Sequence, residues 1–246
     1  MENIESPIKL KTREKIFGCI FLPVHIFLLP IVLGLMGDWL YAKGIISSFY
    51  QLNTVWYIIS FIAVFLIFHD YLKSSFEYLL SNKGAAVKAV LLGFILKYVL
   101  DLFIYILLGA SLGQTSVAYE EEAVQFTREM LNITIACCVL LQPLAEETLF
   151  RGLVFSWIGE KRRTLSYILS ALLFILCQTW QYLLLDISVT DFVVLVASLV
   201  PSTVAFTWAY EKSGTIWASV FLRMISGAIE AYSLYLIYFG MPYLIT

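Results

Sequence analysis

The stretch LAEETLFRG, at residues 144–152, places three charged side chains in a part of the chain that is otherwise apolar. Glu146 and Glu147 are adjacent, and Arg151 follows Glu147 by four residues. A carboxylate can take a proton from water and activate it for hydrolysis, and an arginine can neutralise or orient a carboxylate. Because ionised groups are costly within a bilayer, these side chains are the first candidates for a functional site.

Helical spacing divides these three side chains into two sets. Glu147 and Arg151 lie one turn apart on the same face, so an internal ion pair that orients the helix is the simplest interpretation for them. Glu146 points about 100° away from Glu147 and has no cation on its own helix. We therefore expect the two carboxylates to face different neighbours. Glu146 should have either a role in chemistry or a cation on another helix.

The elements that hold these residues are predicted to be membrane helices. Of the 246 residues, 61% are hydrophobic and 14% are charged, and the mean hydropathy is +0.86. Soluble globular domains contain roughly 45–50% apolar and about 25% charged residues. The chain is therefore expected to be an all-α polytopic membrane protein, in which residues 16–246 form a single transmembrane domain.

Apolar runs long enough to cross a bilayer recur along the chain. A membrane helix needs about 20 mostly apolar residues, and the sequence contains about seven candidates. A short amphipathic helix that lies at the membrane interface is expected over residues 70–85. The seven runs cover residues 16–36, 53–69, 86–110, 132–158, 164–185, 190–210 and 215–239.

Lysine and arginine are distributed unevenly between alternate connecting segments, and this bias predicts the orientation. Eleven lie at the N-terminus and after the second, fourth and sixth runs, whereas the opposite side has two, Lys43 and Arg128. The segment 1–15 is therefore predicted to be cytoplasmic, and the acidic stretch YEEEA at 119–123 to lie on the outer side. Inside the runs, Lys97 and Asp101 have the spacing of an ion pair within one helix.

Three motifs resemble those of the CPBP family of intramembrane proteases, which includes CAAX proteases and the Abi group. PLAEETLFRGLVF at 143–155 resembles the first motif, EExxxR. SALLFILCQTW at 170–180 is similar to the second, FxxxH, and SGTIWASVFLRMISGA at 213–228 to the third, HxxxN. The resemblance covers roughly residues 85–235. It implies a CPBP-like helical bundle in a bacterial plasma membrane.

The resemblance also implies how peptide hydrolysis would proceed. The first glutamate, here Glu146, would activate water. The histidines and asparagine of the other two motifs would bind a metal ion or stabilise the oxyanion. This chain has Phe174 of the second motif, but Gln178, Arg223 and Gly227 occupy the remaining three positions. The first motif is thus retained, and the other site positions are degenerate.

These replacements argue against a metal cofactor. An arginine has no lone pair for a metal ion, and glutamine is not among the ligands that zinc prefers. His25 and His69 lie outside the motifs and are interpreted as packing or interfacial residues, and the four cysteines as buried reduced thiols. Arg223 is expected to reach Glu146 on another helix and neutralise it. Zinc is expected only if the chain is an active protease.

Two hypotheses of different classes follow. The favoured one is a catalytically inactive CPBP-like protein that acts as a membrane scaffold or as a regulator of a membrane or envelope protein. The alternative is an active intramembrane endopeptidase in which Glu146 activates water, and Gln178 and Arg223 donate hydrogen bonds to the oxyanion. Transport is a third class, but the sequence has no repeated half and no pair of broken helices. The expected partners are the lipid bilayer and a membrane or envelope protein. No nucleic acid is expected to bind.

Overall fold

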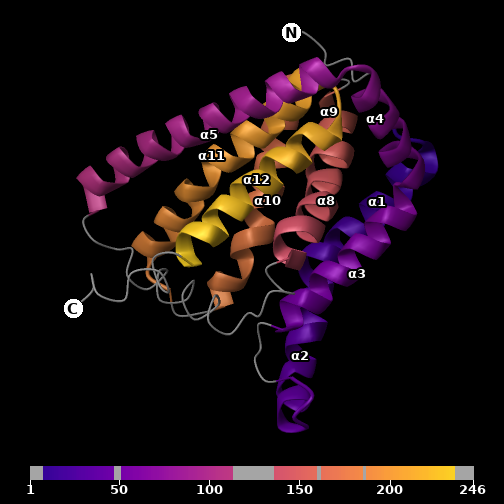
Figure 1. The fold of residues 1–246 in the computed structure, drawn as a ribbon. Coiled ribbons are helices and arrows are strands. Elements are labelled where there is room, and N and C mark those ends of the chain that lie inside the picture. The colour runs from indigo at the N-terminus through magenta and orange to yellow at the C-terminus, as the bar shows by residue number, and fades with distance from the viewer. Residues whose placement is uncertain (1–7, 47–50, 113–135, 160–161, 185–186, 236–246) are drawn as a thin grey trace.

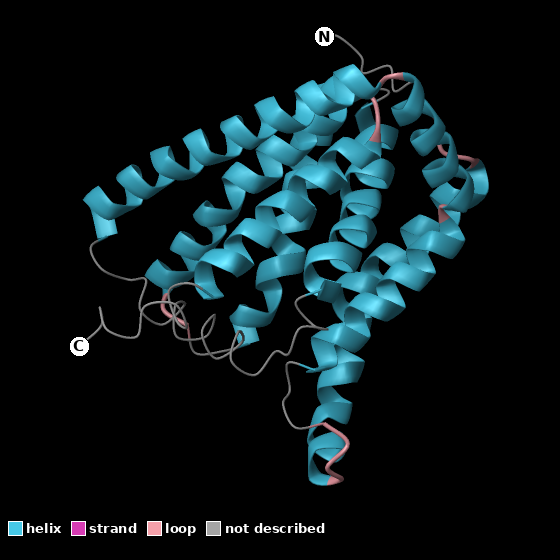
Figure 2. Ribbon diagram, viewed as in Figure 1, coloured by secondary structure: helices cyan, strands magenta, loops and turns pink. Residues whose placement is uncertain are grey.

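The structure is a computed structural model that describes residues 8–46, 51–112, 136–159, 162–184 and 187–235. The regular elements in these ranges are all helical (Figure 2). The acidic stretch 119–123, Arg128, Lys161 and the beginning of the predicted run 132–158 lie outside the described residues.

The helical segments follow one another with short connections wherever both neighbours are described. In chain order they are α1 (Thr12–Pro23), η1 (Val24–Leu28), α2 (Leu29–Ala42), α3 (Gln51–Ile67), α4 (His69–Ser81), α5 (Lys83–Leu112), η2 (Cys137–Leu141), α8 (Gln142–Glu147), η3 (Thr148–Phe155), α9 (Ser156–Gly159), α10 (Arg163–Thr179), η4 (Trp180–Leu184), α11 (Val189–Ser213) and α12 (Ile216–Tyr235). The segments η1, η2 and η3 are π-helical, and η4 is a 3-10 helix.

The charged motif lies on the central element of this bundle. The segment from α8 to η3 packs against α10 and α12 on one side and against α1 and α3 on the other (Figure 1). The long helix α5 lies along one edge of the bundle and packs against α11 and α12. Residues 142–156 are all buried, as expected for a helix that is covered by neighbours all round,.

The polytopic character is confirmed, but the predicted number of seven spans is not. Among the described residues, four helical stretches are long and apolar enough to cross a membrane. A fifth exists if α3 and α4, which meet at 82°, are one bent span. The four stretches are Thr12–Ala42, Lys83–Gly109, Arg163–Leu184 and Val189–Ser213. The other predicted runs are also helical where they are described, so the count of seven remains a prediction.

Two of the π-helical segments, η1 and η2, are followed by prolines and change the course of the helices that contain them. Both η1 and η2 end two residues before a proline, Pro30 and Pro143 respectively. A proline in a helix has no N–H for the carbonyl four residues earlier, and its ring crowds that carbonyl. The preceding turns widen, so that Leu29 N–H bonds to Val24 O and Gln142 N–H bonds to Cys137 O, each five residues back. Such turns reorient the side chains that they carry.

The predicted amphipathic helix is present as α4, and a buried carboxylate fixes where it starts. Glu14 on α1 is 1% exposed. Its Oε1 accepts a hydrogen bond of 2.8 Å from the backbone N–H of Tyr71, in the first turn of α4. Carboxylates are favourable at helix N-termini because the first N–H groups are unpaired there. The first helix begins at Thr12, four residues before the predicted start at residue 16. The added turn contains Glu14, which anchors the start of α4.

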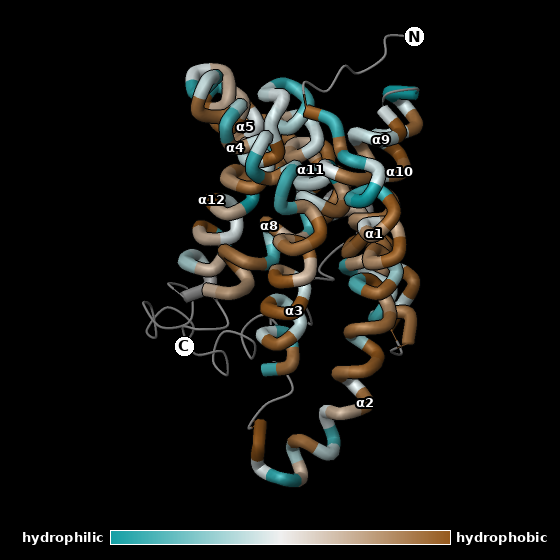
Figure 3. Tube along the Cα trace, turned by 90° about the vertical axis from the view of Figure 1, so that its right-hand side faces the viewer, coloured by the Kyte–Doolittle hydropathy of each residue, from teal (hydrophilic) through white to brown (hydrophobic). Residues whose placement is uncertain are grey.

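The outer surface of the bundle is apolar, as contact with lipid requires. Figure 3 shows hydrophobic residues along α2, which extends beyond the rest of the bundle. Leu35 on α2 is 78% exposed, and Leu102 and Phe103 on α5 are each 59% exposed. Together with the four candidate spans, this surface supports the predicted contact with a lipid bilayer.

One glycine allows α1 to approach its neighbours closely, and this contact is testable. A Cβ added to Gly18 would lie 2.5 Å from Phe68 Cζ and 2.9 Å from Leu153 Cδ2, and Phe68 is fully buried. We expect Gly18→Ala to lower the free energy of unfolding by about 1–3 kcal/mol, because a packed core resists added atoms. The matched control is Gly34→Ala on α2, where nothing lies within 4 Å of the added Cβ. Equal midpoints for the two variants in denaturant would show that this approach is unimportant.

The cytoplasmic position of the N-terminus remains a prediction from charge distribution. Reporter fusions after residues 45, 80, 188 and 212 test it, because these positions follow the first, second, fifth and sixth predicted runs. We expect the signals to alternate, with residues 45 and 188 outside and residues 80 and 212 in the cytoplasm. A fusion at residue 80 that reports from outside would overturn the orientation.

Candidate functional site

The three charges of the first motif are fully buried. Glu146, Glu147 and Arg151 are each 0% exposed, and they lie on α8 and the start of η3. Charges that leave water lose their hydration, so their burial requires opposite charges and hydrogen bonds in good geometry. The contacts of each charge therefore determine what chemistry the site can perform.

Glu146 accepts hydrogen bonds from three side chains. Gln142 Nε2, one turn earlier, donates to Oε1 at 2.8 Å. Gln178 Nε2, on α10, donates to Oε2 at 2.7 Å. Arg223 Nη2, on α12, lies 2.6 Å from the same Oε2. The ion pair expected between Glu146 and Arg223 is confirmed, and both oxygens of the carboxylate are engaged.

Glu147 is shared by two arginines. Its Oε1 lies 3.1 Å from Arg151 Nη1 and 3.3 Å from Arg223 Nη1. The expected pair of Glu147 with Arg151 is therefore confirmed. The expectation that the two carboxylates face different neighbours holds for Gln142, Gln178 and Arg151 but not for Arg223, whose forked guanidinium reaches both,. Among the described residues, Oε2 of Glu147 has no hydrogen-bond partner.

Arg151 joins the central helix to α11. Its Nη2 donates to Thr203 Oγ1 at 3.0 Å and to the backbone oxygen of Thr203 at 3.3 Å, and its Nε donates to Thr207 Oγ1 at 3.3 Å. The centroid of the Phe174 ring lies 4.7 Å from Arg151 Cζ and 5.0 Å from Arg223 Cζ, so both cations contact the same aromatic ring,.

We call Glu146, Glu147, Arg151 and Arg223 the buried charge network. Its two carboxylates are matched by two guanidinium groups, so the formal charges cancel. Gly227, four residues after Arg223, adds no polar group to this network. A Cβ at that position would lie 4.0 Å from Val139 Cγ2 of η2, so the position borders the segment that leads into α8.

Residues 128–229 match the sequence model of the family described as type II CAAX prenyl endopeptidase Rce1-like. This part of the chain is an Rce1-like domain. The match includes all three motifs, although it is shorter than the stretch 85–235 over which the sequence resembles the family. No curated protein and no solved structure matches the chain.

The positions of the Rce1-like domain that were expected to supply metal donors do not fit a metal ion. Gln178 directs its amide N–H toward Glu146, and Arg223 directs a guanidinium at the same oxygen. Both groups donate hydrogen bonds here, and neither presents a lone pair to a cation at this contact. Gly227 has no side chain. A cation held in the manner of the family motif therefore has no ligand besides the first-motif carboxylates.

A histidine from outside the Rce1-like domain borders Glu146, and sequence reasoning missed it. His25, on η1, is 1% exposed, and its Nδ1 lies 2.9 Å from Ser60 Oγ on α3. Its Nε2 is buried and has no hydrogen-bond partner among the described residues. The ligand-type atoms of His25, Glu146 and Cys177 all lie within 4.8 Å of one another. The interpretation of His25 as a packing residue is thus incomplete.

A weak signal for this contact exists in the sequence. His25 and Ser60 each interrupt an apolar run, and a polar side chain inside a membrane helix needs a polar neighbour. His69, in contrast, has a side chain that is 56% exposed, and its Nδ1 lies 3.4 Å from Asp70 Oδ1. Its surroundings agree with an interfacial residue.

A second set of charges inside the membrane helices is separate from this site. Lys97 Nζ lies 2.8 Å from Asp101 Oδ2, which confirms the expected pair on α5. It also lies 2.9 Å from Glu230 Oε1 on α12. Lys97 therefore connects two helices, whereas the spacing on α5 alone indicated a contact within one.

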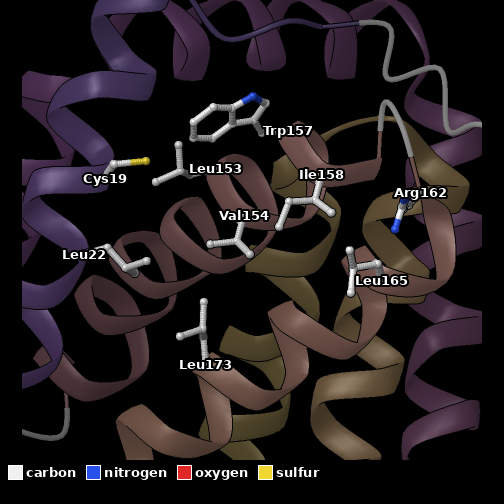
Figure 4. A pocket seen from close by; sticks show the side chains of 9 residues that line it. All are labelled: Cys19, Leu22, Leu153, Val154, Trp157, Ile158, Arg162, Leu165 and Leu173. Carbon is white, nitrogen blue, oxygen red and sulfur yellow. The ribbon is translucent and has the colours of Figure 1, made fainter.

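A surface pocket also lies apart from the buried charge network. It has a volume of about 510 Å³ and opens between α1, the end of the central segment and α10 (Figure 4). Its lining is aliphatic and aromatic apart from Cys19 and Arg162, and it includes none of the motif positions that were predicted as site residues. The nine lining residues are Cys19, Leu22, Leu153, Val154, Trp157, Ile158, Arg162, Leu165 and Leu173.

Proposed function

We propose that this chain is a catalytically inactive member of its protease family, which acts as a membrane scaffold or as a regulator of a membrane or envelope protein. The observation that carries the proposal is the saturation of Glu146. Its two oxygens accept hydrogen bonds from Gln142, Gln178 and Arg223, and its side chain is 0% exposed. A carboxylate must accept a proton from water to act as a base in hydrolysis. Here side-chain donors take the place of that water.

The nature of the replacing residues strengthens this proposal. A hydrolytic site must hold its donors where negative charge develops on the substrate, and leave the base free. In this chain Gln178 and Arg223 donate directly to the base itself. The donors that would stabilise the oxyanion are instead bound to the carboxylate that would activate water. The retained first motif then has a structural task, which is to hold the central helix to α10, α11 and α12.

One observation favours the alternative function, an active endopeptidase. Gln178 Nε2 and Arg223 Nη2 converge on one oxygen of Glu146. Two donors that meet at one point could also serve an oxyanion if a substrate displaced the carboxylate. This alternative requires the buried charge network to open and Glu146 to regain contact with water.

Complementation in cells that lack the gene tests the proposed function. The variant is Glu146→Gln combined with Arg223→Gln, which removes the carboxylate base together with the arginine that would otherwise lose its nearest carboxylate. The matched control is Lys11→Gln with Asp70→Asn, which neutralises an exposed ion pair of 2.6 Å that is not part of the buried charge network. We expect both double variants, at wild-type expression, to restore the wild-type phenotype.

The opposite result would support the alternative. If the Glu146 and Arg223 double variant is expressed at the wild-type level but fails to complement, the role of the protein depends on these groups. Accumulation of an uncleaved membrane protein in the same cells would then identify the chain as a protease. The control variant must still complement for this conclusion, because it reports on the general effect of removing an ion pair.

A further inference from the structure

We propose that His25, Glu146 and Cys177 form a binding site for a divalent metal ion of the zinc class. The site shares Glu146 with the first motif. Its other two ligands are not the motif positions 178, 223 and 227, and its histidine lies outside the matched residues 128–229. The ligand-type atoms of the three residues lie within 4.8 Å of one another, and all three residues are buried. The inference goes beyond the proposed function and does not depend on it.

The orientation of His25 is the first argument. Its Nδ1 lies 2.9 Å from Ser60 Oγ, and a ring N–H that donates to an oxygen there leaves the lone pair on Nε2,. Histidine ligands of metal ions usually donate their second ring nitrogen in this way, which fixes the ring. The ring also packs against Trp56, with 5.2 Å between the ring centroids. His25 is thus held with Nδ1 committed to Ser60, and its Nε2 has no hydrogen-bond partner among the described residues.

The free nitrogen is the second argument. A buried polar atom without a hydrogen bond is destabilising, so natural proteins rarely leave one without a ligand or a water molecule. His25 Nε2 is such an atom among the described residues. A metal ion at the centre of the three residues would use this lone pair and remove the destabilisation.

The donor types select the class of ion. The site offers one imidazole nitrogen, one sulfur and one carboxylate oxygen, and zinc and cobalt bind all three types. Magnesium and calcium prefer oxygen ligands alone. Cys177 binds as a thiolate, so formation of the metal–sulfur bond releases the Sγ proton to the solvent. No electron transfer is involved in this step.

Arg223 limits the affinity of the site. Its Nη2 lies 2.6 Å from Glu146 Oε2, so an incoming cation must share the carboxylate with a guanidinium. Arg223 can keep its contacts with Glu147 Oε1, at 3.3 Å, and with the ring of Phe174. Three protein ligands are also fewer than the four of a closed zinc site. We therefore expect reversible binding and not a permanently held ion.

The ion would also occupy the carboxylate that hydrolysis needs as its base. A metal ion bound by Glu146 therefore fits a conformational or regulatory role, in which it ties η1 and α10 to the central helix. These segments lie far apart in the sequence, and His25 is brought to the other two ligands by the packing of η1 against α10 and by its contacts with Ser60 and Trp56 of α3.

Cobalt titration of the purified full chain in detergent tests the site. Cobalt bound by a thiolate gives a charge-transfer absorption in the near ultraviolet, which oxygen and nitrogen ligands do not give. After removal of bound metal with a chelator, we expect this absorption to saturate at about one cobalt per chain. It should disappear in Cys177→Ser, and the affinity should fall by about tenfold or more in His25→Gln. The matched controls Cys137→Ser and His69→Gln should behave like the wild type.

Several results would overturn the site. These are the absence of the thiolate absorption in the wild type, its persistence in Cys177→Ser, or an equal loss in Cys137→Ser. A measurement that needs no variant guards against misfolding of the substituted proteins. X-ray absorption of the zinc-loaded wild type should show one sulfur together with nitrogen and oxygen ligands. A first shell of nitrogen and oxygen alone would exclude Cys177 and reject the proposal.

Discussion

Replacement of Arg151 by methionine should lower the free energy of unfolding by about 3–5 kcal/mol, the range seen when one member of a buried ion pair is removed. Arg151 is 0% exposed and binds Glu147, Thr203 and Thr207. Methionine has a similar length but no donor, so Glu147 would keep only its longer contact with Arg223, at 3.3 Å, among these interactions. Equilibrium unfolding in detergent with added denaturant measures the loss.

The control for this prediction is Arg163→Met. Arg163 lies 2.6 Å from Glu211, but its side chain is 41% exposed. Ion pairs that water can reach contribute about 0–1 kcal/mol, so the control should lose far less stability than Arg151→Met. Similar losses of unfolding free energy for the two variants would show that the buried ion pair of Arg151 stabilises the fold no more than an exposed one.

Arg223→Met should be nearly as harmful, and a second substitution should partly repair it. The single variant leaves Glu146 ionised and 0% exposed without its cation, which we expect to cost about 3–5 kcal/mol. Glu146→Gln with Arg223→Met removes both charges, and the amide can still bond to Gln178 and Gln142. We expect the double variant to be more stable than Arg223→Met by about 1–3 kcal/mol, the size of coupling between residues in contact.

The four proteins of this double-mutant cycle should be compared under one set of unfolding conditions. If the loss of stability in the double variant equals the sum of the losses in the two single variants, Glu146 and Arg223 are not coupled. The central claim about the neutralised site would then lose its energetic basis, even though the two side chains lie 2.6 Å apart.

Local spacing in the sequence was sufficient to predict the pairs within one helix. Glu147 with Arg151, and Lys97 with Asp101, follow directly from the distance of four residues,. The contact of Arg223 with Glu146 was also predictable, because a buried carboxylate requires a cation and the motif alignment placed one opposite it. The composition likewise predicted the all-helical membrane fold.

Contacts that depend on packing between distant segments were not predictable in this way. His25 reaches Glu146 because η1 packs against α10 and α3 packs against α8, and the polar interruption of an apolar run by His25 does not indicate which helix it faces. The convergence of both carboxylates on Arg223 was missed because a helical wheel gives directions but not the reach of a guanidinium. The contact of Glu230 with Lys97 was also not predicted, because it depends on how α12 packs against α5.

Peptide hydrolysis by the reconstituted protein is the most direct test of the central claim, which is that the retained first motif no longer activates water. The wild type and Glu146→Gln should be placed in liposomes and supplied with prenylated CAAX peptides and with membrane-spanning peptides, and new amino termini should be counted by mass spectrometry. We predict that the wild type cleaves no faster than Glu146→Gln. Cleavage by the wild type that Glu146→Gln abolishes, in samples of equal folded content, would contradict the account and establish the chain as an active endopeptidase.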